Sequence, residues 1–482
     1  MTATIPVDLS GQWWLSEAEK DKVEGVLHLS PETWPILELS GRFDPGSPYG
    51  TRIPVILGYT LGAKPVTLIG CRWHGGGESS GWHDGTHHRL EFEKYSADVA
   101  LVGAHVIPAQ GQGCRRLMMR YTRLDEWIYG RGSALRLFEV YDALRKGESN
   151  RCTVDFQPEA GCTCRVAGAS IKLACALNAS SLGETGIALK PDVFVDVALD
   201  APMEFLAAWE EYGLELQHLF SLLTGVPIRR QSLFAMTNSP QGSDGSEVEV
   251  IFPDSPASSG WSRVKWYDML TEYRDLSSGL GQCIESWLTR DAKTRRAARS
   301  FLVARDGTHY LEQRFLELAR ALEVYYEVEH PSERLMNQDS FDTLVEELMT
   351  IVTQRTEHTV QADIRLGLPG LNLPSLATKL RQLFATQETV LPQLASKADS
   401  LAKDVRKWRV ALTHLTGQSD AVGADFDKLH DLCDLMELTL EMCLLARLGI
   451  PPEAVSAAVK RRLDHRPGLR MLLGLEPESS EA

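Results

Sequence analysis

The spacing of apolar residues changes once along this 482-residue chain, near residue 201, and the change limits the folds available to it. Before it, short apolar runs such as residues 26–29 and 36–39 are separated by glycine and proline, a pattern that predicts β-strands. After it, apolar residues recur three and four positions apart, as on one face of a helix. We therefore predict an α+β protein, in which a β-rich N-terminal domain is followed by an all-α helical bundle.

The same patterns divide the chain into four segments. Residues 1–200 form the predicted β-rich domain, and residues 201–280 form a helical and loop connecting region, where a helical pattern ends at Gly225. Residues 281–473 form the helical bundle, and residues 474–482 form an acidic tail. Two or three domains are also what the length of the chain predicts.

Composition limits the partners and the compartment. The formal net charge of −15 argues against a chain-wide basic surface for nonspecific nucleic-acid binding, although a local basic groove stays compatible with it. Nine cysteines, an odd number, predict reduced thiols. Residues 1–10 show no secretory signal, and the longest apolar run, residues 438–450, is interrupted by Glu441 and Arg447. We expect a cytoplasmic protein with no membrane segment.

Two clusters of candidate metal ligands lie in the N-terminal half. Zinc sites favour ligands in paired short spacings, which neither cluster offers. We therefore interpret the histidines as polar residues of a flexible loop over residues 75–85, and the cysteines as small apolar residues in strands. A metal role for either cluster stays open, and we expect no cofactor. The clusters are His74, His83, Asp84, His87 and His88, and Cys152, Cys162 and Cys164.

A candidate catalytic pair lies late in the helical half. Arg409 and His414 are separated by four residues. An arginine holds a phosphate in a fixed fork geometry, and a histidine exchanges a proton near neutral pH. Together they are suited to cutting RNA through its own 2′-hydroxyl without a metal. The spacing alone is a weak signal, because such a pair arises by chance about once in a chain of this composition. The alternative is a solvated arginine and a histidine near a helix C-terminus.

The N-terminal segment carries two adjacent tryptophans, in Gly11-Gln12-Trp13-Trp14-Leu15. Two predicted strands with a strand-like apolar pattern follow, at residues 23–27 and 37–41. This opening resembles that of the ApeA anti-phage defence family, as do residues 214–227. The helical half is similar to the HEPN ribonuclease domain of that family. Residues 314–323 resemble the first long helix of that domain. Arg409 and His414 match its two functional positions. The resemblance implies a HEPN-like bundle behind an ApeA-like N-terminal domain.

One residue departs from the family pattern. Val410 follows the arginine where the family commonly has asparagine, which leaves Thr413 as the candidate for a polar contact. Residues five apart on a helix point about 140° from each other, so Arg409 and His414 do not share a face. The resemblance implies a site shared between copies, in a homodimer or a higher even oligomer.

Three basic residues flank the pair and are candidate RNA-binding residues: Lys403, Arg406 and Lys407. The alternative is a solvated helix face that also carries Asp404.

The resemblance implies an abortive-infection endoribonuclease that cleaves cellular RNA, with tRNA among the candidate substrates. His414 would act as general base or acid, and Arg409 would stabilise charge on the phosphate. The N-terminal half would sense infection or regulate the nuclease, and a phage protein is a candidate activator. The alternative function is a non-catalytic HEPN-like scaffold or a nucleotide-binding regulatory protein. A metal-dependent phosphoesterase is less favoured, because no carboxylate–histidine constellation stands out.

Overall fold

The chain divides into two compact units in the computed structural model. The first unit is Met1–Phe220, Ile228–Trp266 and Glu272–Thr289, and the second is Ser221–Pro227, Tyr267–Thr271 and Arg290–Ala482. The structure describes residues 6–43, 52–83, 86–129, 161–166, 168–181, 187–238, 245–253, 269–276, 278–305, 310–413 and 425–475.

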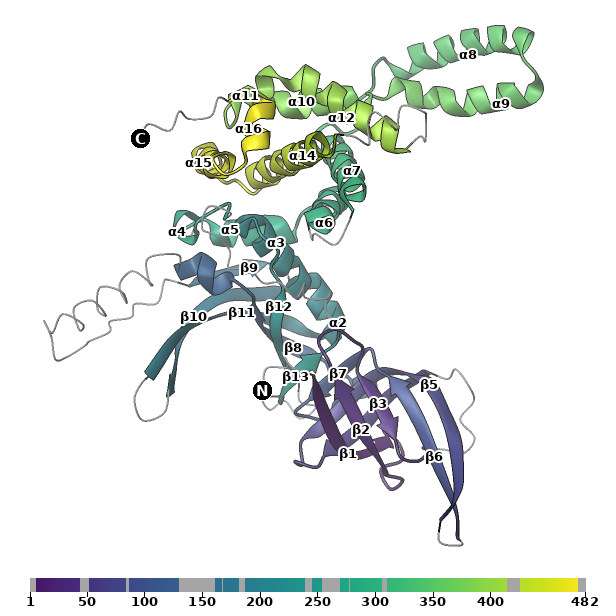
Figure 1. Cartoon of the computed structure of the whole chain (residues 1–482), viewed down its shortest axis with the longest axis vertical. Coiled ribbons are helices and arrows are strands. Elements are labelled where there is room, and N and C mark those ends of the chain that lie inside the picture. The colour runs from purple at the N-terminus through teal and green to yellow at the C-terminus, as the bar shows by residue number, and fades with distance from the viewer. Residues whose placement is uncertain are drawn as a thin grey trace, which may run out of the picture. The chain divides into compact units, whose positions relative to one another are not determined.

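Antiparallel strands dominate the first unit, and all those described belong to one hydrogen-bonded sheet of thirteen strands (Figure 1). The order is β4-β1-β2-β3-β6-β5-β7-β13-β12-β8-β11-β10-β9. The predicted β-rich N-terminal domain is therefore confirmed. The strands are β1 (Val7–Leu15), β2 (Val23–Leu29), β3 (Ile36–Leu39), β4 (Arg52–Thr60), β5 (Pro65–His83), β6 (Thr86–Ser96), β7 (Val99–Val102), β8 (Cys114–Tyr121), β9 (Cys162–Val166), β10 (Ala169–Ser181), β11 (Ile187–Met203), β12 (Arg230–Thr237) and β13 (Glu247–Ile251).

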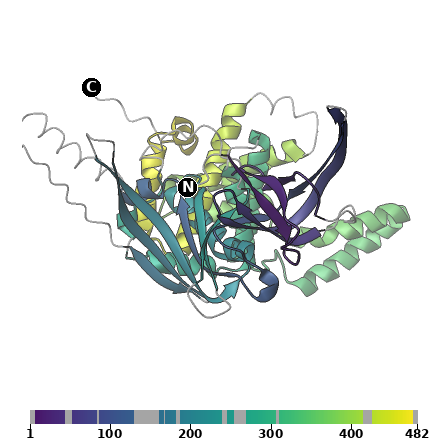
Figure 2. The same cartoon turned by 90° about the horizontal axis from the view of Figure 1, so that it is seen from below.

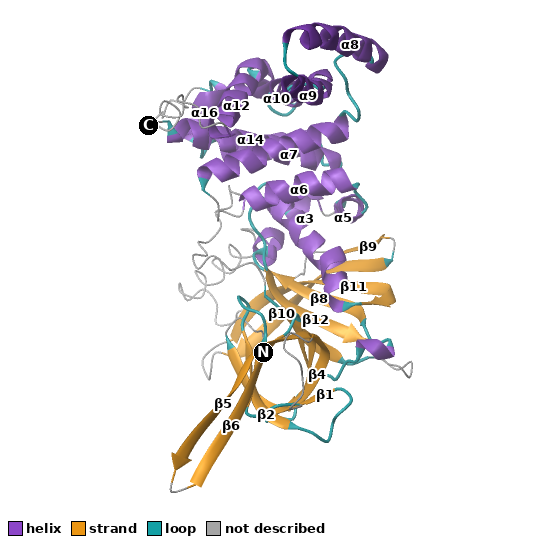
Figure 3. Ribbon diagram, turned by 90° about the vertical axis from the view of Figure 1, so that its right-hand side faces the viewer, coloured by secondary structure: helices purple, strands orange, loops and turns teal. Residues whose placement is uncertain are grey.

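The first six strands close into a barrel, because β4 pairs with both β1 and β5 (Figure 3). Successive residues of a strand point to opposite faces of the sheet, so the side chains of Trp13 and Trp14 lie on opposite faces of β1. Trp13 lies fully buried in the core cluster and donates its indole N–H to the carbonyl of Gly25 at 3.2 Å. Trp14 packs against Tyr59 and His105 in a separate contact. Trp14 is buried as well, in a second core cluster with Val55 and Leu57, so both tryptophans act as large apolar anchors, one on each face of β1.

The flexible loop predicted over residues 75–85 is wrong for residues 75–83, the part of it that the structure describes. There β5 continues to His83 and pairs antiparallel with β6. The glycines mark close contact, since a Cβ at Gly76 would lie 2.8 Å from the carbonyl oxygen of Phe92, and one at Gly77 would lie 3.0 Å from its ring. The run of glycines therefore serves strand pairing, where the sequence pattern suggested a loop.

The region predicted as a helical and loop connection, residues 201–280, also contains strands β12 and β13. They pair with each other and with β8 and β7, so they continue the N-terminal sheet. Loop-rich sequence lies next to both strands, so their alternation of apolar and polar residues was not recognised as a strand pattern. The same region contains the helices α2 (Phe205–Ala208), the π-helical η3 (Trp209–Gly213) and α3 (Leu214–Thr224), which ends before Gly225 at φ 75°.

Helices dominate the second unit, as predicted. The long helix α14 is its centre, since all residues from Leu432 to Leu445 are buried. Ser375 caps α10 by accepting from the backbone N–H of Thr378 at 3.2 Å, as expected of a serine at that position. The main helices are α6 (Ala292–Arg305), α7 (Leu311–Glu329), α8 (Gln338–Arg355), α9 (His358–Gly367), α10 (Leu376–Ala385), α11 (Pro392–Ser396), α12 (Ala398–Thr413), α14 (Phe426–Arg447), α15 (Pro452–Leu463) and α16 (Pro467–Leu473).

Helices α8 and α9 lie side by side as a hairpin beside the other helices of this unit (Figure 1 and Figure 2). No residue of α9 is buried. Across the described part of the chain, we find no helix with both the length and the apolar character needed to cross a membrane.

Buried charges join the helices of the second unit. Glu441 on α14 is fully buried and forms ion pairs with Arg305 of α6 and Arg462 of α15. Arg305 also contacts Glu437 on α14, Nε to Oε1 at 3.0 Å. Burial alone would raise the pKa of Glu437, but the charges of Arg305 and Arg314 hold that pKa below its ordinary value.

The same arginines reach the end of α3. Arg462 donates from Nη2 to the carbonyl of Gly225 at 2.9 Å, and Arg305 donates from Nη1 to the carbonyl of Ser221 at 3.2 Å. The carbonyl of Gly225 lies beyond the last turn of α3, where carbonyls lack partners within the helix, while that of Ser221 also accepts from the backbone N–H of Gly225 at 3.1 Å. Because Leu214–Phe220 lies in the first unit, α3 runs continuously from one unit into the other.

We predict that Arg462→Ala lowers the free energy of unfolding by about 3–5 kcal/mol, because it leaves the buried Glu441 with one partner fewer. Urea denaturation followed by circular dichroism measures the change. The control is Lys460→Ala, an exposed cation on the same helix, which should shift stability by no more than about 0.5 kcal/mol. Equal stability of the two variants would contradict the role assigned to the buried charges.

Candidate functional site

Helix α12 presents two faces with different chemistry. Leu401, Val405 and Trp408 are buried at helical spacing, and α12 packs with them against α10 and α7. The opposite face is exposed. The segment before α12 forms the separate short helix α11, and the chain turns at Lys397 before α12 starts.

Arg409 lies between these faces and is held by Glu323 of α7. Its Nη2 lies 2.9 Å from Oε2 of Glu323, and its Nη1 lies 3.3 Å from Oε1. This two-point contact fixes the plane of the guanidinium, as in other arginine–carboxylate forks. The Arg409 side chain is 39% exposed and that of Glu323 is 20% exposed, so the pair is open to solvent on one side.

The fork leaves Arg409 able to bind a further anion. A guanidinium carries five N–H donors, and the contact with Glu323 engages one on each Nη. In the described part of the chain, no other partner of this guanidinium is found. Glu323 was not predicted as a site residue. The only hint was its place in residues 314–323, the segment that resembles the first long HEPN helix.

His414 lies outside the described residues, since the described part of α12 ends at Thr413. The pairing of Arg409 with His414 therefore stays a prediction. Val410, at the position where the family commonly has asparagine, is 45% exposed. The Thr413 hydroxyl donates to the carbonyl of Arg409 at 2.8 Å, so it bonds to its own helix.

The three candidate RNA-binding residues share the exposed face of α12. Lys403 pairs with Asp399 at 2.6 Å. Arg406 and Lys407 are exposed, and among the residues that the structure describes neither forms an ion pair. The nearby Asp404 instead pairs with Lys428 of α14 at 3.0 Å. The face therefore keeps positive charge one turn before Arg409.

The candidate metal clusters are only partly described. His74 is exposed, while Cys152, Asp84 and the side chains of His83, His87 and His88 lie outside what the structure describes. Cys162 and Cys164 are half-buried on β9. Within the described ranges, no group of three or more histidine, cysteine, aspartate or glutamate side chains is arranged to hold a metal ion.

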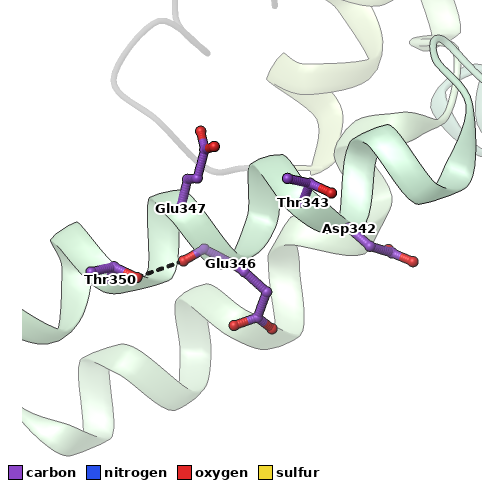
Figure 4. Close-up of a pocket in the computed structure, with 5 residues that line it drawn as sticks. All are labelled: Asp342, Thr343, Glu346, Glu347 and Thr350. Carbon is purple, nitrogen blue, oxygen red and sulfur yellow. Dashed lines mark hydrogen bonds between the residues drawn. The ribbon is translucent and has the colours of Figure 1, made fainter.

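A shallow depression on α8 offers no alternative site. Its lining comes from this single helix, and three of the five residues are carboxylates that would repel a phosphate (Figure 4). The Thr350 hydroxyl donates to the carbonyl of Glu346 at 2.9 Å, within the helix. The lining residues are Asp342, Thr343, Glu346, Glu347 and Thr350.

Comparison with protein families assigns both halves of the chain. The model of ApeA N-terminal domain 1 matches residues 8–287, more than half of the chain, and the model of the Apea-like HEPN domain matches residues 316–454. The second range includes Glu323 and Arg409. No curated protein and no solved structure matches the chain. HEPN domains are commonly ribonucleases, and a match to the ApeA-type family suggests a role in anti-phage defence. The chain belongs to the ApeA family, with an ApeA N-terminal domain followed by an Apea-like HEPN domain.

Proposed function

We propose that this protein is an anti-phage defence endoribonuclease that cleaves cellular RNA without a metal. The observation that carries the proposal is the position of Arg409. It is held in a fork by Glu323, lies about one turn after the exposed Arg406, and falls inside the range matched by the HEPN model. Cellular tRNA is one candidate substrate, and the proposed compartment is the cytoplasm, where tRNA is found.

The proposed chemistry uses the RNA's own hydroxyl. His414 removes the proton of the ribose 2′-hydroxyl, or donates one to the leaving oxygen. Arg409 stabilises the negative charge that builds on the phosphate. Lys403, Arg406 and Lys407 bind neighbouring phosphates of the strand. The product carries a 2′,3′-cyclic phosphate, and DNA is not cut because it lacks the 2′-hydroxyl.

The proposed active assembly is a homodimer or a higher even oligomer. One copy supplies one arginine and one histidine, which point apart if the helix continues regularly. Two copies meeting about a two-fold axis bring two of each to one groove. Proton transfer on both sides of the phosphorus then becomes available.

We propose that the ApeA N-terminal domain senses infection or restrains the nuclease, with a phage protein as the candidate activator. An unrestrained ribonuclease would kill its host, so a control element is needed. Helix α3 offers a route for such control, because it runs continuously from the first unit into the second.

A second candidate function is a non-catalytic scaffold or a nucleotide-binding regulatory protein. Val410 favours it, because an exposed valine replaces the asparagine common in the family beside the arginine. In that case Arg409 would bind a phosphate without cleaving it.

We predict that His414→Ala reduces RNA cleavage by about 10²–10⁴-fold, the usual contribution of general acid–base catalysis, and abolishes toxicity in cells. Arg409→Ala should have a similar effect. Cleavage of labelled cellular RNA by the activated protein measures both. The control is His358→Ala, which removes an exposed histidine at the start of α9 and should leave cleavage unchanged. Undiminished cleavage by folded His414→Ala protein would falsify the catalytic assignment.

We predict that Glu323→Gln lowers the rate of cleavage by about 10–100-fold, because an arginine freed from its fork leaves the productive geometry. The matched control is Glu317→Gln on the same helix, whose carboxylate lies 3.9 Å from an exposed Arg320. Single-turnover rates at saturating RNA separate this effect from weaker binding. Faster cleavage by Glu323→Gln would instead mean that Glu323 masks Arg409, and would overturn the positioning role.

We predict that an excess of His414→Ala protein suppresses the activity of wild-type protein mixed with it, because mixed dimers lack one of the two histidines. Activity is measured across mixing ratios after subunit exchange has been confirmed with two affinity tags. If activity falls only in proportion to the wild-type fraction, each copy works alone and the shared site is wrong.

A further inference from the structure

Cys162 and Cys164 lie on one face of an edge strand. Among the strands that the structure describes, β9 is the last in the sheet, and it pairs with β10, with Cys162 opposite Leu173 and Cys164 opposite Ile171. Residues two apart in a strand point to the same face, so both thiols lie on the face that carries these apolar partners. Both cysteines are half-buried, which leaves them open to small solutes.

Helix α5 (Leu280–Leu288) covers this face. A Cβ at Gly281 would lie 3.2 Å from Cβ of Cys164 and 3.5 Å from Sγ of Cys162, so the helix backbone rests directly on the pair. The buried Cys283 and the carboxylate Glu285 of the same helix lie close enough to interact electrostatically with the pair. At its other end, α5 is tied to α3 by a hydrogen bond from the indole of Trp287 to the carbonyl of Glu215 at 2.7 Å.

The two thiols interact directly. A side-chain hydrogen bond between them lowers the pKa of Cys162 to about 7 and raises the pKa of Cys164. A thiol with that pKa is about half thiolate at pH 7, against a few per cent for an ordinary cysteine. Four buried cysteines differ from Cys162, because burial raises the pKa of each thiol to about 12. They are Cys71, Cys114, Cys433 and Cys443.

We propose that Cys162 and Cys164 form a peroxide-sensitive dithiol that closes reversibly to a disulfide beneath α5. The Cys162 thiolate attacks one oxygen of hydrogen peroxide, the O–O bond breaks, and the departing hydroxide takes a proton to become water. Cys162 is then a sulfenic acid. The sulfur of Cys164 attacks it, the S–O bond breaks, and the Cys164 proton leaves with the hydroxide as a second water. One peroxide is reduced to two waters while two thiols are oxidised to one disulfide.

Closing this disulfide disturbs the strand. Cα atoms two residues apart in a strand are about 6.6 Å from each other, near the upper limit for a disulfide. Strand β9 must therefore bend, which is easier for a strand that, within the described part of the sheet, pairs on one side only. Disulfides that strain the fold are readily reduced, so a thiol reductant should reopen this one. Because Gly281 rests on the pair, bending β9 changes the packing of α5.

The test treats purified full-length protein with one equivalent of hydrogen peroxide at pH 7, alkylates the remaining thiols and digests with trypsin and Glu-C. Cleavage after Glu159 and Arg165 isolates residues 160–165, which contain both thiols and exclude Cys152. We expect this peptide to appear unalkylated and two hydrogen atoms lighter, and dithiothreitol to restore two alkylatable thiols. A disulfide that joins this peptide to any other would overturn the proposal.

Single variants test the order of the steps. Cys164→Ser should stop the reaction at a sulfenic acid on Cys162, which dimedone traps, and Cys162→Ser should slow thiol loss at Cys164 at least about tenfold. The matched control is Cys175→Ser on the neighbouring strand β10, which should form the disulfide at the wild-type rate. Hydrogen exchange of residues 280–288 should quicken on oxidation. Cys162 that oxidises no faster than Cys175, or unchanged exchange in α5, would overturn the proposal.

Discussion

The ion pairs of Glu441 set the architecture of the second unit. A carboxylate that is fully buried on the central helix is costly unless charged partners reach it, and two arginines from other helices do so. These arginines also bind the carbonyls at the end of α3. The positions of α6, α15 and the end of α3 around α14 therefore depend on one set of charges.

The candidate site depends on this frame through α7. That helix packs against α14, and Arg314 on it pairs with Glu437 and Asp434. About two and a half turns further along α7, Glu323 reaches Arg409. The orientation of the guanidinium is thus determined by helices far apart in the sequence, whereas the exposed cations of α12 depend only on local helical spacing.

Features that depend on residues close together in the sequence could be predicted, and features that depend on contacts between distant segments could not. The change of hydrophobic period predicted the order of β-rich and helical domains, and Gly225 predicted the end of the helix that became α3. The strand at residues 75–83 was missed because glycines that permit close strand contact look the same as glycines in a loop. Glu323 and the partners of Glu441 were missed because both depend on contacts between distant segments. Glu441 was even interpreted as a charge that interrupts an apolar run, when it is a fully buried residue of the core.

The central claim is that RNA is cut through its own 2′-hydroxyl, without a metal. The most direct measurement compares two synthetic RNAs that differ only at the cleaved nucleotide, where one carries a 2′-deoxyribose. Both are incubated with the activated protein in excess EDTA, and the product ends are analysed by mass spectrometry. We predict cleavage of the all-ribose RNA to a 2′,3′-cyclic phosphate and no cleavage of the RNA that carries the 2′-deoxyribose. Equal cleavage of both RNAs, or loss of all activity in EDTA that magnesium restores, would contradict it.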